Sequence, residues 1–132
     1  MSDSAGVTVE GGLDEKPQVT LPAGDPPPEL VIHDVVEGEG EAVEAGATVN
    51  AHYVGIGWTT KRQFDASWDR GASLELPLGR VIAGWQKGIP GMKPGGRRLL
   101  IIPGELAYGR TPPPGGRIGP NETLVFVIDL VS

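Results

Sequence analysis

Few residues of this sequence have the types and spacings that conventional catalysis needs. Cysteine is absent from the 132 residues, and the only two histidines are His33 and His52. This leaves no thiolate nucleophile and no three-ligand metal site of nitrogen and sulfur donors. We therefore expect each histidine to be a hydrogen-bonded residue of a strand, and we predict a site that uses no metal and no other cofactor.

Two further classes of catalytic site have little support. Neither of the glycine-rich nucleotide-binding patterns, GxxxxGK[S/T] and GxGxxG, occurs in the sequence. Asp65 and Asp69 could supply two carboxylates to a carbohydrate hydrolase, but both fall on one short segment, whereas that chemistry needs carboxylates on opposite sides of the sugar.

The aromatic side chains are the remaining candidates. The seven present fall on separate predicted elements: Tyr53, Trp58, Phe64, Trp68, Trp85, Tyr108 and Phe126. Two interpretations are open at this point. They could form an ordinary core built from the few large side chains available, or they could line an apolar binding pocket.

The elements that would position these rings are mostly strands. Alternating or continuous apolar residues predict strands over 30–36, 48–55, 62–67, 73–78, 97–102 and 123–131. One helix is predicted over 81–88, where Val81, Trp85 and Ile89 share a face and Gly88 and Pro90 end it. So short a helix persists only when it is packed against a sheet. The predicted fold class is α+β, an antiparallel sheet of about five strands forming a half-barrel around one short α-helix.

Composition divides the chain into two parts. Residues 1–28 form an acidic leader rich in proline and glycine, which we expect to be mostly disordered, with one short edge strand at 18–21. Residues 29–132 form the predicted domain. Residues 1–44 carry 11 acidic side chains against Lys16 alone, whereas residues 45–132 carry 6 acidic and 10 basic side chains. Without a dense basic stripe, we expect no nucleic-acid partner.

A long connection, residues 103–122, contains five prolines and five glycines. Loops of this length in small domains are commonly functional, and Tyr108 within it favours that reading. No apolar run approaches the ~20 residues of a membrane span, and we find no secretory signal at the start of the sequence. We expect a cytoplasmic monomer.

Five short motifs in fixed order resemble a known family. They are His52-Tyr53-x-Gly55, Phe64-Asp65-x-Ser67 followed by Asp69-Arg70, Val81-Ile82-x-Gly84-Trp85-x-x-Gly88, Leu106-Ala107-Tyr108-Gly109 and Thr123-Leu124-Val125-Phe126. From about Glu29 onward the chain resembles the FKBP-type peptidyl-prolyl cis-trans isomerases, the immunophilins that bind tacrolimus and rapamycin. The family's fold, a half-barrel wrapped around a helix, is the one that the periodicity predicts.

The resemblance implies a proline-binding pocket and names its residues. Those with implied catalytic roles are Tyr53, Asp65, Ile82 through its backbone N–H, and Tyr108 through its hydroxyl. Those implied to bind substrate are Phe64, Arg70, Leu74, Leu76, Val81, Trp85, Ile118 and Phe126, with Trp85 as the floor. Implied partners are proline-containing peptides, unfolded proteins and the macrolides tacrolimus or rapamycin.

Physical chemistry agrees with a pocket that lacks an acid, a base and a metal. Rotation about an Xaa-Pro bond breaks no covalent bond and only twists an amide over a barrier of ~18–20 kcal/mol. The twisted amide is less dipolar than the planar one, so a dry apolar pocket favours the twisted state. Asp65 would act by orientation and ion pairing, because a neighbouring Arg70 lowers the pKa of a carboxylate and disfavours proton transfer.

The sequence departs from the family pattern in four places. Leu74 and Leu76 replace aromatic residues found in well-studied members, the flap at 110–117 is one residue longer, the Gly79-Arg80 turn is short, and Trp68 is unusual. The principal hypothesis is an isomerase that assists protein folding. The alternative is a binding module that holds proline peptides or macrolides without turnover.

Overall fold

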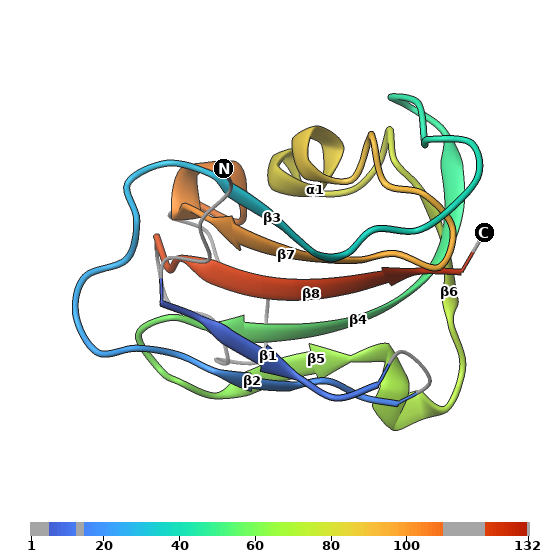
Figure 1. Cartoon of the computed structure of the whole chain (residues 1–132). Helices are drawn as coiled ribbons and strands as arrows, with labels where there is room; N and C mark the ends of the chain where they lie inside the picture. Colours follow the sequence, from blue (N-terminus) through green and yellow to red (C-terminus); the bar gives the residue numbers. More distant parts are fainter. Residues whose placement is uncertain (1–5, 13–14, 110–120, 132) are drawn as a thin grey trace.

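The computed structural model describes residues 6–12, 15–109 and 121–131. Its main sheet contains β3 (Val31–Val36), β4 (Thr48–Gly57), β5 (Gln63–Ala66), β6 (Leu74–Pro77), β7 (Arg97–Ile102) and β8 (Leu124–Leu130). The strand order is β3-β7-β8-β4-β5, with β6 paired to β4 as well, and every pairing is antiparallel (Figure 1). The predicted antiparallel sheet with one short helix is confirmed.

Strand β4 explains how six strands form this sheet. Its ten residues are long enough to pair with β6 through 48–51 at one end and with β5 through 54–56 at the other. Its other edge pairs with β8 through 51–57. The two segments that carry the predicted pocket walls, β5 and β6, are therefore held by one strand.

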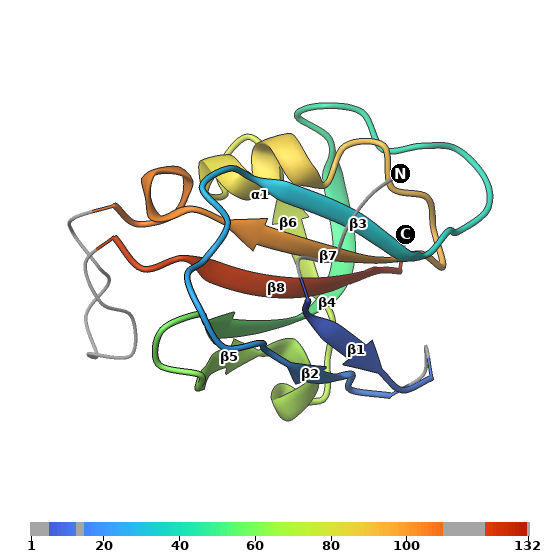
Figure 2. The ribbon, with the colours of Figure 1, turned by 60° about the vertical axis from the view of Figure 1, so that its left-hand side comes forward.

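Helix α1 (Ala83–Gly88) covers one face of the sheet, shown from two directions in Figures 1 and 2. It begins two residues later than predicted, because Ile82 has an extended backbone with ψ of 154°. Trp85 and Ile89 are buried in the core between α1 and the sheet, which also contains Tyr53, Leu100 and Phe126. Within the described residues, no helix is long and apolar enough to cross a membrane.

The structure describes two short strands within the leader, which composition led us to expect to be mostly disordered. Strands β1 (Thr8–Glu10) and β2 (Gln18–Thr20) pair with each other as an antiparallel hairpin, which lies on the face of the sheet opposite α1 (Figures 1 and 2). The strand expected at 18–21 is present, but its partner is β1. Composition missed this hairpin because its few apolar side chains pack against residues distant in sequence: Val7, just before β1, is buried, and Val19 is partly buried.

Several polar contacts fasten the leader to the domain, and those of Arg97 and Trp58 involve buried side chains. The Arg97 guanidinium, 1% exposed, pairs with Asp129 at 2.7 Å. It also donates hydrogen bonds to the carbonyl oxygens of Gly11, Gly12 and Glu15 at 3.0–3.1 Å. Farther along, the Trp58 indole N–H donates to the Gly24 carbonyl at 2.9 Å. These contacts satisfy groups that would otherwise be buried without partners.

Candidate active site

A cavity of about 320 Å³ lies between α1, β4, β5 and β8. Most of its lining is apolar or aromatic, with charged side chains at the edge; the lining residues are Tyr53, Phe64, Asp65, Leu76, Arg80, Val81, Ile82, Trp85, Tyr108 and Phe126. Largely apolar cavities with a few polar groups at the edge are the usual form of small-ligand sites.

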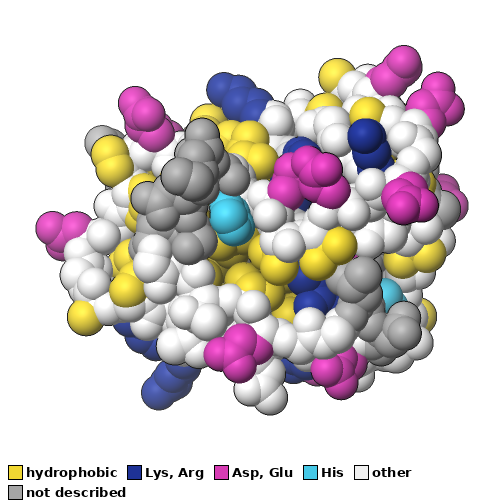
Figure 3. Space-filling view, in the orientation of Figure 1, with side chains coloured by type: hydrophobic (Ala, Val, Ile, Leu, Met, Phe, Trp, Pro, Cys, Tyr) yellow, Lys and Arg dark blue, Asp and Glu magenta, His cyan; other side chains and the backbone are white. Residues whose placement is uncertain are grey.

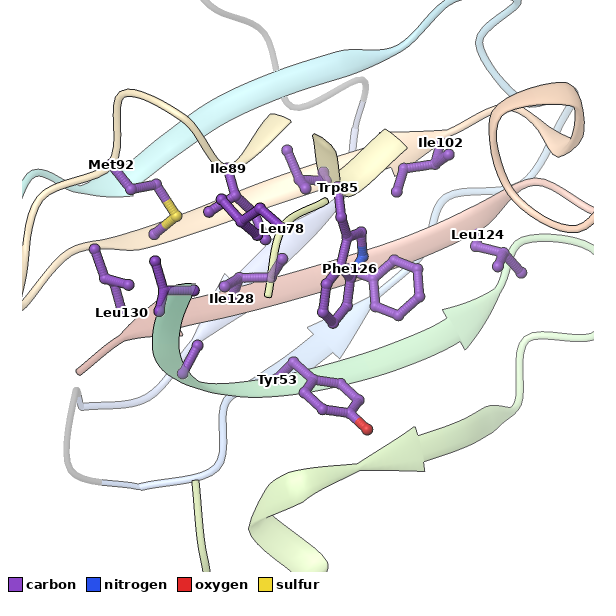
Figure 4. Packing of buried hydrophobic residues seen from close by; sticks show 13 residues of the cluster. Tyr53, Leu78, Trp85, Ile89, Met92, Ile102, Leu124, Phe126, Ile128 and Leu130 are labelled. Atoms are coloured by element: carbon purple, nitrogen blue, oxygen red, sulfur yellow. The ribbon is translucent and has the colours of Figure 1, made fainter. Parts of the chain in front are cut away.

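The aromatic rings meet edge to face around this cavity. Trp85 and Phe126 lie 5.0 Å apart between ring centroids, and Tyr53 and Trp85 lie 5.3 Å apart. Figure 4 shows these three side chains converging from α1, β8 and β4. Such edge-to-face contacts fix ring orientations, so the wall is preformed. Trp85 is only 5% exposed, yet it borders the cavity.

Gly55 makes room for the ring that continues this wall. A Cβ atom at position 55 would lie 2.6 Å from Phe64 Cζ and 2.8 Å from Phe126 Cε1. The Phe64 and Phe126 rings, 5.5 Å apart, can therefore meet over β4 only because residue 55 has no side chain.

A three-residue hydrogen-bond network lies at the edge of the cavity. The Tyr53 hydroxyl donates to Asp65 Oδ2, and the Arg70 guanidinium donates to Asp65 Oδ1 at 2.7 Å and to the Tyr53 hydroxyl at 2.9 Å. The 3₁₀ helix η1 (Ser67–Arg70), which follows β5 directly, brings Arg70 back towards Asp65. The backbone N–H of Ala66 donates to the same carboxylate at 2.9 Å.

This network sets the protonation states at the edge. Burial acts to raise the pKa of Asp65, but hydrogen bonds from Tyr53 and Arg70 outweigh it, so the pKa lies below its ordinary value. Burial and the bond to Asp65 raise the pKa of Tyr53. Asp65 is thus ionised and Tyr53 protonated at neutral pH, a pair suited to orientation and unsuited to proton transfer.

Within the described part of the chain, two hydrogen-bond donors at the cavity are candidates to bind a ligand. None of the hydrogen bonds formed between described residues uses the backbone N–H of Ile82, which borders the cavity just before α1. Tyr108, 37% exposed, borders the cavity from the segment after 3₁₀ helix η2 (Gly104–Leu106). Burial, followed by the charge of Asp65, raises the pKa of the Tyr108 phenol, so the hydroxyl keeps its proton.

The structure brings together most of the side chains predicted from the sequence. Of those described, two do not line the cavity: Arg70 contacts it through Tyr53 and Asp65, and Leu74 packs against the core beside it. Ile118 lies outside the described residues, as does the flap at 110–117.

Arg80 lines the cavity and was missed as a site residue. Its only signal in the sequence is its position two residues before Ile82, in the short Gly79-Arg80 turn.

Trp68 lies away from the cavity. Its ring stacks on His52 at 4.0 Å between centroids, and it packs with the core on the leader side of the sheet. His52 Nδ1 lies 2.8 Å from Ser67 Oγ, so this histidine is hydrogen-bonded as expected. Among the described residues, no group of three His, Cys, Asp or Glu side chains could hold a metal ion.

Comparison with known proteins gives a consistent result. Residues 39–131 match the family described as FKBP-type peptidyl-prolyl cis-trans isomerase. An FK506-binding protein of Streptomyces anulatus is 54% identical over 120 residues, which cover 89% of this chain and 97% of the relative. A probable FK506-binding protein of Corynebacterium glutamicum is 53% identical over 118 residues, covering 89% of this chain and 98% of the relative.

A solved structure extends the likeness to three dimensions. The crystal structure of FkpA from Escherichia coli superposes with a TM-score of 0.71 at 41% sequence identity, covering 78% of this chain and 47% of that one. This chain has the same fold as FkpA, and it is 54% identical to the Streptomyces anulatus relative. The resemblance seen in the sequence motifs is therefore confirmed. This chain belongs to the family of FKBP-type peptidyl-prolyl cis-trans isomerases, and it is an enzyme of that type.

Proposed function

We propose that the cavity binds the proline ring of an Xaa-Pro segment against Trp85 and lowers the barrier to rotation about the Xaa-Pro bond by favouring the twisted amide. We propose that this activity assists protein folding. The observation that carries this proposal is the preformed aromatic wall of Tyr53, Phe64, Trp85 and Phe126 around a cavity of about 320 Å³. A pyrrolidine ring is flat enough and apolar enough to pack on an indole face.

The walls act on the amide through its environment. An amide moved from water into this cavity loses solvation that favours its planar, dipolar form, so the twisted form becomes relatively more accessible. An acceleration of about 10⁴-fold needs only about 5.5 kcal/mol. The N–H of Ile82 and the hydroxyl of Tyr108 would hold the carbonyl groups that flank the rotating bond.

The network at the edge would position the substrate without exchanging protons with it. Arg70 and Asp65 hold the Tyr53 hydroxyl from two sides, which fixes the ring that meets Trp85. We propose the same cavity as the site for the macrolides tacrolimus and rapamycin, on the basis of relatives named FK506-binding protein. The site is built from one chain, which suits a monomer.

A protease-coupled assay on Xaa-Pro peptides, with and without tacrolimus, tests this proposal. We expect turnover above the buffer rate that tacrolimus inhibits, and lower turnover in Trp85→Ala and in Asp65→Val. Trp85→Ala should also destabilise α1, so its unfolding curve is recorded beside the kinetics. Turnover no faster than buffer, with tacrolimus still bound, would leave the alternative of a binding module; unchanged turnover in both variants would remove the site assignment.

A further inference from the structure

Arg80 is a cation at the edge of the cavity that the proposed mechanism does not use. It occupies the turn between β6 and α1, where its backbone N–H donates to the Pro77 carbonyl at 2.9 Å. Its side chain is exposed and borders the cavity. Ile82, two residues later, provides the backbone donor, and Cα atoms of residues 80 and 82 can be at most about 7 Å apart.

The charge of Arg80 has no counterpart in the described part of the chain. Arg70, Arg97 and Arg98 each pair with a carboxylate at 2.6–2.7 Å, whereas no described carboxylate lies within ion-pairing distance of Arg80. Asp65, the only acidic residue among the described lining residues, is already paired with Arg70. Among the described side chains at the edge of the cavity, Arg80 is therefore a positive charge without an ion-pair partner.

Several exposed acidic side chains lie on a connection outside the lining of the cavity. Glu37, Glu39, Glu41 and Glu44 are exposed on the connection between β3 and β4, and Figure 3 shows several acidic groups over this end of the molecule. Arg80 thus lines the cavity, while the acidic connection lies outside the lining.

We propose that Arg80 determines substrate specificity, and that this enzyme favours peptides with an acidic side chain directly before or after the proline. The inference rests on the proposed function, since it takes the cavity as the proline site. With the proline ring on Trp85 and a neighbouring carbonyl on the Ile82 N–H, an adjacent residue lies over the turn that carries Arg80. An Arg–carboxylate contact there is charge-assisted and can be bidentate.

Matched peptides test this specificity. Two pairs carry Glu or Gln, either directly before or directly after the proline, and NMR exchange measures the rate constant of isomerisation without a coupling protease. We expect the Glu peptide to exceed its Gln partner in kcat/KM by roughly two- to fivefold at one position or both, the range of an exposed ion pair. At about 1 M salt, where the Debye length is about 3 Å, the ratio should approach one.

Variants assign the effect to Arg80. The Glu-to-Gln ratio of kcat/KM should fall to about one in Arg80→Gln and below one in Arg80→Glu. Lys93→Gln removes an exposed positive charge outside the lining and should leave the ratio at its starting value. Because each ratio compares two peptides on one enzyme, a general loss of activity or stability cancels.

The outcomes distinguish failure of the Arg80 proposal from failure of the proposed isomerase function. Catalysis of the Gln peptides with no advantage for Glu at either position would overturn the role of Arg80 and leave the isomerase intact. A Glu advantage that persists in Arg80→Gln would also overturn it. Failure to accelerate any peptide, the Gln pair included, would overturn the proposed function itself.

Discussion

At the scale of single residues, the hydroxyl of Tyr53 shows how this site is arranged. It donates to Asp65 and accepts from Arg70, so both roles of the phenol oxygen are used within the protein. The Arg70 guanidinium also lies 5.9 Å over the centre of the Tyr53 ring. The Tyr53 ring is thus held at its edge and at its face, so it forms a fixed part of the cavity wall. This indicates that the wall is preorganised for a ligand and does not form by induced fit.

The pH dependence of activity follows from this network. The folded-state pKa of Asp65 lies below its ordinary value of 3.8, so its stabilising bonds are present above that pH and are lost as the pH falls through the folded-state pKa. The pKa of Tyr53 lies above 10.0, so its contribution is present below that pH and is lost as the pH rises through the folded-state value. We expect kcat/KM to be constant between about pH 5 and pH 9.

Measurement of kcat/KM across this range checks the expectation, with Asp65→Asn as the companion variant. Asp65→Asn should lower the free energy of unfolding at pH 7 by roughly 1 kcal/mol, a small value because the Asp65 side chain is 39% exposed. That difference from wild type should shrink as the pH falls below about 4. A bell-shaped profile centred within the constant range would instead assign proton transfer to a residue of the site.

At the scale of elements, two glycines determine how closely α1 approaches the sheet. A Cβ atom at Gly84 would lie 2.4 Å from Ile102 Cγ2, and one at Gly88 would lie 2.6 Å from Leu100 Cδ2. Glycine weakens an isolated helix by about 1 kcal/mol relative to alanine. In this protein the close approach to β7 outweighs that cost, because it places Trp85 against Tyr53 and Phe126.

Gly84→Ala tests the importance of this contact. Despite its higher helix propensity, we expect the variant to lose about 1–3 kcal/mol of unfolding free energy, as overpacked cores do. We also expect lower kcat/KM, because α1 carries Trp85. Urea unfolding and peptide kinetics measure the two effects.

Two further variants serve as controls for Gly84→Ala. A Cβ at Gly79 would meet nothing within 4 Å, so Gly79→Ala should leave stability and activity nearly unchanged. Ile102→Ala in the Gly84→Ala background removes the atoms that clash. We expect it to lower the free energy of unfolding less in that background than in the wild type. Additive effects of the two substitutions would show that α1 does not depend on this close approach.

At the scale of the whole molecule, the sheet is covered on both faces by different parts of the chain. Helix α1 and the candidate cavity occupy one face, and the leader hairpin occupies the other. Val7 is 4% exposed, and it packs with Val54 and Val127, whose side chains point away from the cavity. The leader therefore contributes to the stability of the domain from the face opposite the candidate cavity.

Deletion of residues 1–28 tests this separation of roles. We expect a loss of about 3 kcal/mol or more in unfolding free energy, since burial of one Val or Leu side chain contributes about 1.5–3 kcal/mol and the Arg97 contacts are lost as well. At low temperature, where the shortened chain stays folded, kcat/KM should remain close to that of the full chain. Equal stability of the two chains would show that the hairpin does not cover the sheet in solution.

Arg97→Met isolates the polar part of this attachment. It leaves Asp129, 7% exposed, without its partner, and the expected loss is about 3–5 kcal/mol of unfolding free energy. Adding Asp129→Leu removes the uncompensated charge and should restore part of that loss. Thermal unfolding of the three proteins compares them, and the same stability in single and double variants would contradict a coupled buried pair.

Local pattern was enough to predict much of this protein. Alternating or continuous apolar residues predicted the six strands of the main sheet to within about two residues, although β1 was not predicted. The spacing of Trp85 and Ile89, with Gly88 and Pro90 behind them, predicted the helix. These features are readable because they depend on neighbours within a few positions. The order of the motifs around Tyr53, Asp65, Trp85 and Phe126 was sufficient to identify the family, because each motif is short and contiguous.

Only the tertiary structure decided which side chains share a surface. Tyr53, Phe64, Trp85 and Tyr108 meet because β4 pairs with both β5 and β8 while α1 crosses the same face, a set of contacts between residues far apart in the chain. The same kind of contact made the leader a hairpin and stacked Trp68 on His52 away from the cavity. It also brought Arg80 to the cavity's edge. Long-range packing is a property of the folded surface, so no local spacing encodes it.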